Sequence, residues 1–590
     1  DGLQSQQLLY ALGALDKLPA QGGGRVRPSG KGAAAADAGG PALASLLCGA
    51  AADAAPSLTA NKLGIAAWAL GRPAVLRQVP ASVAEAWLVA LRHRCAQVAE
   101  HLNWRTVGHI ELALRALGDK LAQRDDAPTN DAGTVLDEDD ELVRLLTTEA
   151  ARSVETSSER AARLNSAPAA LLTRCAPWSK RSPGGSRRFL LAGFDPDEAL
   201  DDSVRSAGWE PVHWRRFAAT SPDSAAAPWP PVDAGSFGAG AMRWPWYAAG
   251  EAALMMLHAM AVALPPGAPL WIAGNFDEGA SGAPAAAFGC FGDAKLLAEE
   301  ASTAVYAALR SEAGVAAASG PRGKLAGWRA DSRLNLPGAP SGGLPWTIFP
   351  GLFAGGGLDV MTSALLASLP VPPRRRARIL DACCGSGTIA AALGAAHGNL
   401  DLRLDMLDAD AVAVEAARCN VPAARRVMLC ATWPHRDKEG VRSESRPRRY
   451  DWIVSNPPVH RGQPDSFEVV IGLIRGARKR LRSSGVLWIV AQEQVPIGRM
   501  LQAYGRFACV RAIASDDGRF VTWSAEGKRR KGVTATDGPT TKSAEREQCE
   551  AATPTNRNRA TRQAFADEKG SKRARLKADA TTKEKKSRVY

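Results

Sequence analysis

A short apolar strand that runs into a glycine-rich turn constrains the fold of this chain more than any other feature. Arg378 to Ala382 reads as a buried strand, and Cys383 to Thr388 follows as a turn of small residues and glycines. An Ala/Leu-rich helix comes next, from Ile389 to Ala396. Strand, glycine turn and helix in this order are typical of the nucleotide-binding units of a parallel, doubly wound sheet.

A second strand supplies an acid where a nucleoside ligand needs one. Leu402 to Leu407 is apolar on alternate positions and ends at Asp408. An acid about 20 residues beyond the glycines, at a strand end, suits the two hydroxyls of a ribose. The glycines are not followed by the Lys-Ser/Thr pair of a triphosphate-binding loop, so a nucleoside triphosphate is not the expected ligand.

Val427 to Ala431 reads as a third strand, and a fourth, Tyr450 to Ser455, runs into Asn456, Pro457 and Pro458. Each proline fixes its own φ and drives the residue before it towards extended backbone, so Asn456 sits on a stiff corner at a strand end. The side-chain oxygen of Asn456 and the carbonyl of Pro457 then converge on one point, which is what holding a planar amino group requires. Alone, Asn-Pro is also an ordinary turn. Its order after the glycine turn and Asp408 favours a site.

Here the sequence resembles the S-adenosylmethionine-dependent amino-methyltransferases, and most of all the ribosomal RNA guanine-N2 methyltransferases of the small or large subunit. The resemblance runs over roughly Arg187 to Ala525, more than half of the chain. Its motifs are Pro350 to Phe353, Gly357 to Val360, Ser455 to Gly462, Gly485 to Ala491 and Asp517 to Phe520.

The resemblance implies a class I methyltransferase that uses S-adenosyl-L-methionine and acts on a guanine amine. Two departures weaken the substrate assignment more than the cofactor assignment: Cys383 stands where a glycine is common, and Val459 where an aromatic side chain usually stacks on the base. Trp433 is an alternative to Thr432 as a neighbour of the adenine. By resemblance, the catalytic residues are Asn456, Pro457 and Pro458; the cofactor-binding residues are Asp381, Cys383, Gly385, Gly387, Asp408, Thr432 and Asn456; and the substrate-binding residues are Val459 and His460.

Two other functions stay open. Asn-Pro-Pro also presents adenine N6 or the side chain of a protein glutamine, because each is a planar NH2 group. A non-catalytic RNA-binding or ribosome-assembly factor is the third reading, motivated by Cys383, Val459 and the basic tail. The end motif Asp517 to Phe520 and the paired α/β half favour the guanine family.

The rest of the chain divides by composition into three further regions. Residues 1–150 read as helical, either degenerate helical repeats of an RNA-binding kind or a plain Ala-rich bundle, with Gly71 and Gly118 as helix stops. Residues 185–335 resemble a degenerate methyltransferase-like α/β copy without a cofactor signature, and residues 346–525 form the catalytic domain. Residues 526–590 are polar and charged, and predict a basic disordered tail.

Charge points to a polyanionic partner, ribosomal RNA or a ribosomal subunit. The chain has a net charge of +14; residues 526–590 hold 18 Lys/Arg and 9 Asp/Glu, which leaves +5 for the remainder. The Arg-rich stretch 434–449 and the basic end of a helix from Phe467 to Leu481 face either RNA or solvent.

Cysteine spacing and hydropathy bear on metal binding, on the redox compartment and on membrane association. The ten cysteines form no Cys-x-x-Cys pair and no Cys/His cluster, so we expect no metal and a reducing compartment. The longest apolar run, Ala252 to Leu264, is too short to span a bilayer, so we expect no membrane partner. Because the sequence begins at Asp1, we expect the start to be either processed or incomplete, and localisation stays open between the cytoplasm and an organelle (mitochondrion or plastid).

Overall fold

A computed structural model places most of the chain between residues 40 and 528. The residues it describes are 40–122, 141–175, 178, 185–219, 223, 225–230, 236–245, 250–431, 433, 449–459, 466–505, 507–515 and 518–528. The tail 526–590 lies outside these residues from 529 onwards, as do Thr432, His460 and most of the Arg-rich stretch 434–449.

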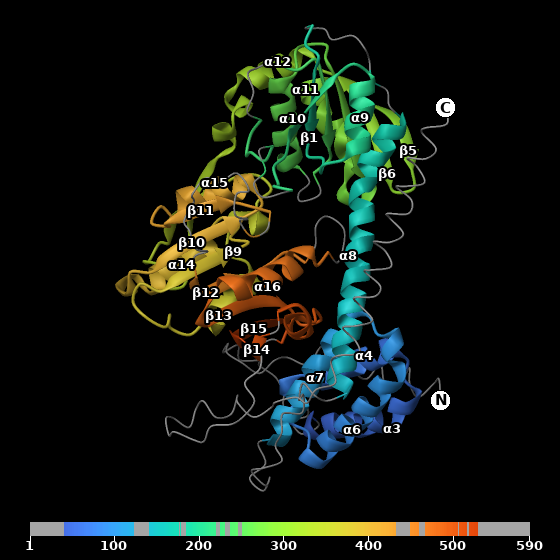
Figure 1. Cartoon of the computed structure of the whole chain (residues 1–590), viewed down its shortest axis with the longest axis vertical. Helices are drawn as coiled ribbons and strands as arrows, with labels where there is room; N and C mark the ends of the chain where they lie inside the picture. The colour runs from blue at the N-terminus through green and yellow to red at the C-terminus, as the bar shows by residue number, and fades with distance from the viewer. Residues whose placement is uncertain are drawn as a thin grey trace, which may run out of the picture. The chain divides into compact units, whose positions relative to one another are not determined.

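The C-terminal half is a seven-stranded sheet with helices on both faces (Figure 1). Its elements are β9 (Arg378–Ala382), β10 (Arg403–Asp408), β11 (Arg426–Leu429), β12 (Tyr450–Ser455), β13 (Leu481–Gln492), β14 (Phe507–Ala514), β15 (Phe520–Lys528), α13 (Val360–Ser368), α14 (Thr388–Ala396), α15 (Ala411–Asn420), α16 (Glu468–Arg480) and α17 (Ile497–Met500). The strand order is β11-β10-β9-β12-β13-β15-β14. The first five strands are parallel, and β15 is antiparallel to both of its neighbours.

Alternate side chains of the central strands enter two different cores. Leu380 and Ile453 pack with the apolar side of α16, whereas Ile379 and Val454 pack with α14 on the opposite face. Because both faces are covered, these strands read as continuous apolar runs in the sequence, which is typical of a parallel sheet between helix layers. The predicted doubly wound sheet is confirmed.

Residues 188–309 form a second sheet that repeats this plan with one outer strand fewer. Its elements are β1 (Arg188–Ala192), β2 (Glu210–Trp214), β3 (Ala239–Arg243), β4 (Pro269–Asn275), β5 (Lys295–Glu300), β6 (Thr303–Leu309), α9 (Glu198–Ser206), α10 (Glu251–Ala263) and α11 (Ala283–Phe291), followed by α12 (Glu312–Ser319). The order is β2-β1-β3-β4-β6-β5, again parallel strands followed by an antiparallel pair. A hairpin of β7 (Ala330–Leu334) and β8 (Leu344–Ile348) lies between the two sheets in the sequence. The same order with an outer strand removed supports the interpretation of this half as a degenerate copy.

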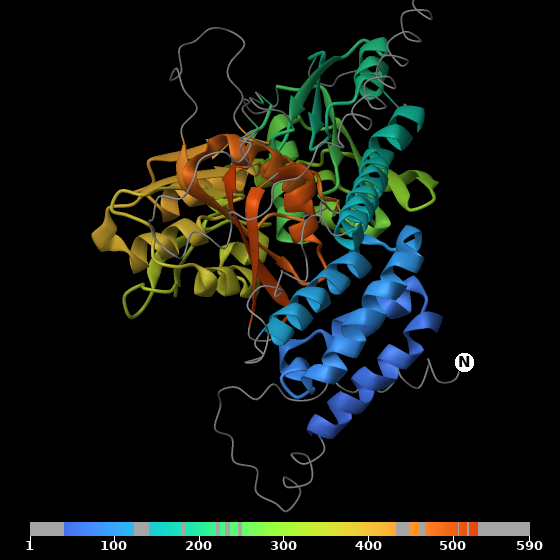
Figure 2. The ribbon, with the colours of Figure 1, turned by 60° about the horizontal axis from the view of Figure 1, so that its bottom comes forward.

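The N-terminal part is helical, as predicted. Its helices are α3 (Gly40–Ala54), α4 (Ala60–Leu70), α5 (Pro73–Leu76), α6 (Ala81–Val98) and α7 (Trp104–Ala122), which stack side by side (Figures 1 and 2). Gly71 ends α4, but the prediction that Gly118 is a helix stop is wrong, because α7 continues to Ala122. The buried Leu117 and the partly buried Leu121 pack into the helical core, and this packing offsets the roughly 1 kcal/mol that a helical glycine costs.

A 35-residue helix, α8 (Glu141–Cys175), follows the bundle. The proposed boundary near residue 150 falls inside it, and α8 contacts α7, α17 and the strands β4, β5 and β6. The helical region also meets α17 of the C-terminal half, through a buried ion pair of Glu111 with Arg499 at 3.3 Å. Among the residues placed in space, no helix is long and apolar enough to cross a membrane.

Candidate functional site

The site is built at the edge of the seven-stranded sheet where three neighbouring parallel strands end. β9 ends at Ala382, β10 at Asp408 and β12 at Ser455, and the order β10-β9-β12 makes them direct neighbours. Carboxyl ends of parallel strands are where open α/β sheets bind ligands. The structure therefore brings the glycine turn, the acid and the Asn-Pro-Pro corner to one edge.

The turn after β9 contains three residues with left-handed backbone. Cys383 has φ 58°, Gly385 φ 53° and Gly387 φ 94°. Cys383 thus occupies the kind of backbone position that favours glycine, which explains why a glycine is common there and why a cysteine is strained. A Cβ on Gly387 would lie 2.8 Å from Val421 Cγ2, so this glycine serves close packing. A Cβ on Gly385 would meet nothing within 4 Å, so this glycine leaves open space beside the turn.

Asp408 is held at the end of β10 by backbone donors. The Gly385 N–H donates to Asp408 Oδ2 at 2.7 Å, and the Asp410 N–H donates to Oδ1 at 2.8 Å. Burial, helped by the nearby charge of Asp410, raises the pKa of the Asp408 carboxyl to about 6. The acid predicted from spacing is therefore tied directly to the glycine turn.

Asp381 is buried at 1% exposure within β9. Its Oδ2 accepts from the Ala390 N–H of α14 at 3.0 Å, while Oδ1 has no hydrogen-bond partner among the described residues. Burial raises the pKa of this carboxyl to about 8. An unpartnered buried oxygen is costly, and it marks a place where a ligand donor would be stabilised.

The Asn456 amide is oriented by the start of α13. Its Nδ2 donates to Thr362 Oγ1 at 2.9 Å and lies 3.4 Å from Asp359 Oδ1. Asp359 caps α13 by accepting from the backbone N–H groups of Met361 and Thr362. With Nδ2 committed to these oxygens, Oδ1 is left as the acceptor. Sequence reasoning missed the roles of Asp359 and Thr362, although Gly357 to Val360 had been noted as a motif.

The remaining site residues predicted from sequence differ in burial, and two of them are not described. Pro457 is buried, Pro458 is exposed, and Val459 packs partly buried against the apolar core around α16. Thr432 and His460 lie outside the described residues. The alternative that Trp433 flanks an adenine stays a prediction.

The Trp433 ring packs against α16. It is buried, and its Nε1 donates to the Gly472 carbonyl at 2.8 Å. Gly476 gives the ring its space, since a Cβ there would lie 1.6 Å from Trp433 Nε1.

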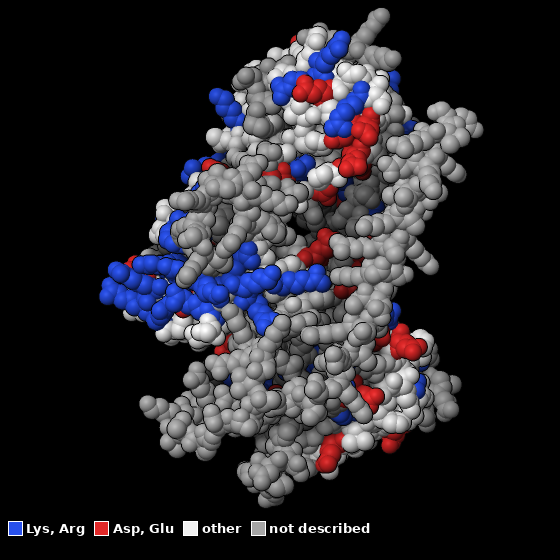
Figure 3. Space-filling model, in the orientation of Figure 1, with Lys and Arg blue, Asp and Glu red and all other residues white. Residues whose placement is uncertain are grey.

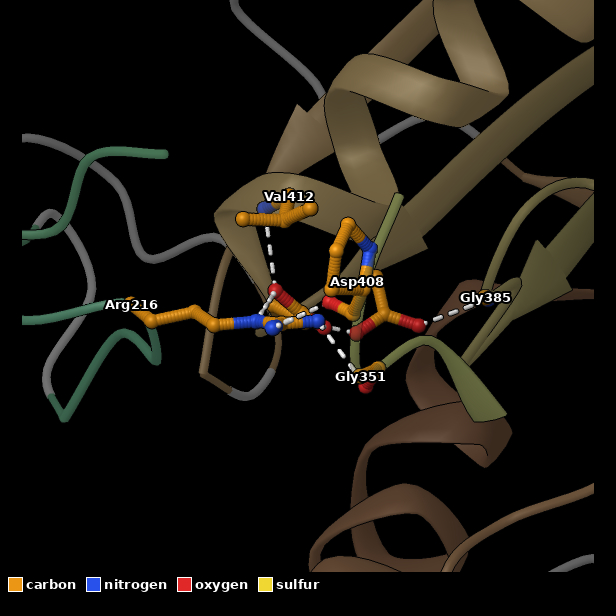
Figure 4. A network of polar contacts seen from close by, with 7 residues as sticks. Arg216, Gly351, Gly385, Asp408 and Val412 are labelled. Atoms are coloured by element: carbon orange, nitrogen blue, oxygen red, sulfur yellow. Dashed lines mark hydrogen bonds and ion pairs between the residues drawn. The ribbon is translucent and has the colours of Figure 1, made fainter. Parts of the chain in front are cut away.

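A third residue missed from sequence is Arg216, which follows β2 of the six-stranded sheet (Figure 4). Its guanidinium binds the carboxylate of Asp410 with two bonds, Nε–Oδ1 at 2.8 Å and Nη2–Oδ2 at 2.7 Å. It also donates to the carbonyls of Pro350 and Gly351 at 2.9 and 3.0 Å. Because the Asp410 N–H holds Asp408, the six-stranded half reaches the site through this side chain. Backbone bonds from the Ala218 N–H to the Ala409 carbonyl and from the Ala411 N–H to the Arg216 carbonyl join the same two segments.

Residues 346–522, which contain the site, match the family described as methyltransferase small domain.

Two curated relatives and one solved structure are similar to this chain. The proteins named ribosomal RNA small subunit methyltransferase C in Salmonella paratyphi A and Salmonella typhi are each 33% identical over 201 residues, which is 34% of this chain and 52% of theirs. The chain spans about half the length of the curated relatives it matches. A structure of a 16S rRNA N2 methyltransferase from T. thermophilus with AdoMet and guanosine covers 61% of this chain and 92% of its own, at 19% identity and a TM-score of 0.47. The resemblance to ribosomal RNA methyltransferases read from the sequence is confirmed. Among the described residues, no group of three or more His, Cys, Asp or Glu side chains could hold a metal.

Proposed function

We propose that this chain is an S-adenosylmethionine-dependent methyltransferase that methylates the exocyclic N2 amine of a guanine in ribosomal RNA. Residues 346–525 would hold the cofactor and the base, and residues 185–335 would support them. The observation that carries the proposal is the Asn456 amide, whose nitrogen is committed to Thr362 so that its oxygen is left to accept. The names of the relatives support the same substrate class.

The residues at this edge fit the cofactor. Gly385 leaves open space at a left-handed turn, and the unpartnered Asp381 Oδ1 offers an acceptor for the amino group of its methionine part. Asp408 would accept from the ribose hydroxyls. When bound, S-adenosylmethionine supplies a methyl group that its sulfonium already activates.

The protein's own contribution is alignment and charge stabilisation. Asn456 Oδ1 and the Pro457 carbonyl would accept the two N–H groups of the base and fix the direction of the nitrogen lone pair. Orientation of this kind and preorganised dipoles supply most of the rate when the bond chemistry is already activated. The two acceptors also stabilise the positive charge that develops on the nitrogen during transfer.

Calorimetric titration of the full chain with S-adenosylmethionine separates the enzyme from a non-catalytic assembly factor. We expect saturable binding at one site. A heat signal that does not differ from buffer dilution would reject the enzyme and favour the assembly factor.

Replacing Gly385 by alanine tests the open space beside the turn. A methyl group there projects into the space assigned to the cofactor, so we expect S-adenosylmethionine affinity to fall at least tenfold. Gly208→Ala is the matched control, because Gly208 also has a positive φ (89°) and nothing within 4 Å of a Cβ. Both variants should lose about 1 kcal/mol of stability from backbone strain. Equal cofactor affinity in the two variants would refute the assignment of this space.

Cofactor affinity should depend on pH through Asp408. Its pKa is raised to about 6, so between pH ~4 and ~6 the folded protein keeps a proton that the unfolded chain loses. Folding stability therefore falls as pH rises through that window and is level above it. Ribose hydroxyls donate best to the charged carboxylate, so we expect affinity to rise from about pH 5 to 7. Asp408→Asn should bind weakly and without this pH dependence; a wild-type affinity that stays constant over the range would contradict the role.

A further inference from the structure

The opposite edge of the catalytic sheet, where the parallel strands begin, is lined with arginines. β9 starts at Arg378, β10 at Arg403 and β11 at Arg426; Arg449 comes directly before β12, and Arg482 is the second residue of β13. Because these five strands are parallel neighbours, their first residues lie along one edge. This edge faces away from the strand ends that carry Asp408 and Asn456.

Neighbouring turns and the end of α16 add more cations to the same edge. We call the whole set the arginine edge: Arg374, Arg375, Arg376, Arg378, Arg403, Arg425, Arg426, Arg449, Arg478, Lys479, Arg480 and Arg482. The same segments contain three acids, Asp401, Asp405 and Asp451, so twelve cations face three anions, a formal surplus of nine positive charges. Figure 3 shows Lys and Arg side chains gathered in a band over this domain.

Some of these arginines stabilise the fold. Arg425 and Arg426 pair with the fully buried Asp405 at 2.8 and 3.0 Å. Arg374 pairs with the buried Asp451 at 3.0 Å. Such contacts explain why a few arginines lie at the start of the sheet, but they do not explain the surplus.

Three members of the edge have no such structural use. Arg375, Arg403 and Lys479 are exposed, and their side chains make no hydrogen bond or ion pair to any part of the chain placed in space. Like charges held this close repel one another and destabilise the compact state. A polyanionic partner would relieve that cost.

We infer that the arginine edge binds the phosphate backbone of structured RNA, at a place remote from the methyl-transfer site. Eleven of the twelve cations are arginines, whose planar guanidinium matches phosphate with two parallel hydrogen bonds. The five strand starts extend over four strand spacings, about 19 Å in all, so the charge forms a line rather than a point. A line of this length suits a nucleic-acid backbone better than a single phosphate.

This role of the arginine edge deepens the proposed function. The identity of the RNA rests on that function. One large RNA would contact both edges of the sheet, with its target base at Asn456 and a separate helical segment along the arginine edge. Contacts to phosphates position an RNA without reading its sequence. The arginine edge would therefore set affinity and register, while the Asn456 corner selects the base.

The test reverses the three cations that have no structural use. Arg375→Glu, Arg403→Glu and Lys479→Glu are combined in the full chain, and binding to a transcript of small-subunit ribosomal RNA is measured by filter binding from ~0.05 to ~0.3 M salt. We expect affinity to fall at least tenfold at about 0.1 M salt. The slope of log affinity against log salt should shrink by about two to three, near 0.7–0.9 for each lost phosphate contact.

The control has the same change in net charge elsewhere. Arg160→Glu, Arg163→Glu and Lys295→Glu alter three exposed cations on α8 and β5, and should leave affinity within about threefold of the wild type and the slope nearly unchanged. Equal losses in the two triple variants would overturn the inference. So would polyaspartate displacing the RNA from the wild type as effectively as unlabelled RNA of equal charge, because the edge would then suit an acidic protein.

The outcomes separate the inference from the proposed function. RNA binding that depends on the arginine edge, in a protein that transfers no methyl group, would uphold the edge and reject the enzyme. Methyl transfer to RNA, with RNA binding unchanged in the edge variant, would uphold the enzyme and reject the role of the arginine edge. S-adenosylmethionine affinity should be the same in the edge variant and the wild type, which checks that the site has kept its structure.

Discussion

Replacing Asn456 by alanine is expected to lower the turnover of methyl transfer by about a hundredfold to a thousandfold. This is the usual loss when one preorganised polar group is removed from a reacting centre. Because Asn456 would act on the target amine, S-adenosylmethionine affinity should stay within about threefold of the wild type. The measurement is single-turnover transfer of a labelled methyl group together with a cofactor titration.

Thr362→Val tests the orientation of the Asn456 amide separately from its role as a hydrogen-bond acceptor. The Thr362 hydroxyl holds the Asn456 amide at 2.9 Å, and valine keeps its shape while removing the oxygen. Thr362 is a positioning residue, so we expect about a tenfold loss in kcat with little change in KM. Unchanged turnover in Asn456→Ala would remove the catalytic assignment, whatever the threonine variant does.

The second large effect concerns stability. Arg216→Ala should reduce the free energy of unfolding by about 3–5 kcal/mol, because it leaves the buried Asp410 carboxylate without its partner. It also frees the carbonyls of Pro350 and Gly351. Since Asp410 holds Asp408, cofactor affinity should fall as well. Urea unfolding and a cofactor titration measure the two effects.

The control for this variant is Arg205→Ala. Arg205 pairs with Asp201 and Asp202 on the surface of α9, with 55% of its side chain exposed, and exposed pairs contribute about 1 kcal/mol or less. A loss for Arg216→Ala as small as that for Arg205→Ala would contradict the structural role of Arg216.

Three strands of the catalytic sheet, β9, β10 and β12, could be predicted from sequence to within a few residues, because strands buried on both faces are continuous apolar runs. Tyr450 to Ser455 was predicted and observed as β12. The glycine turn could also be predicted from the local sequence, because left-handed backbone favours glycine. That Asp408 and Asn456 meet at one edge followed from the parallel order of the strands.

Contacts between distant parts of the chain could not be predicted in this way. Arg216 and Asp410 are 194 residues apart, and Asn456 and Thr362 are 94 apart. No local pattern marks such pairs. The packing of Trp433 could not be predicted, because the space that takes its ring is made by Gly476, on a helix more than 40 residues later. Only parts of the arginine edge could be recognised as basic from sequence, because its members come together when the strands pair.

The most direct test of the account is the identity of the methylated nucleoside. The full chain is incubated with methyl-labelled S-adenosylmethionine and small-subunit ribosomal RNA, the RNA is digested to nucleosides, and the labelled product is identified by mass spectrometry. The account predicts labelled N2-methylguanosine, reduced at least a hundredfold with Asn456→Ala. Label in N6-methyladenosine, in protein glutamine or in no product would contradict it.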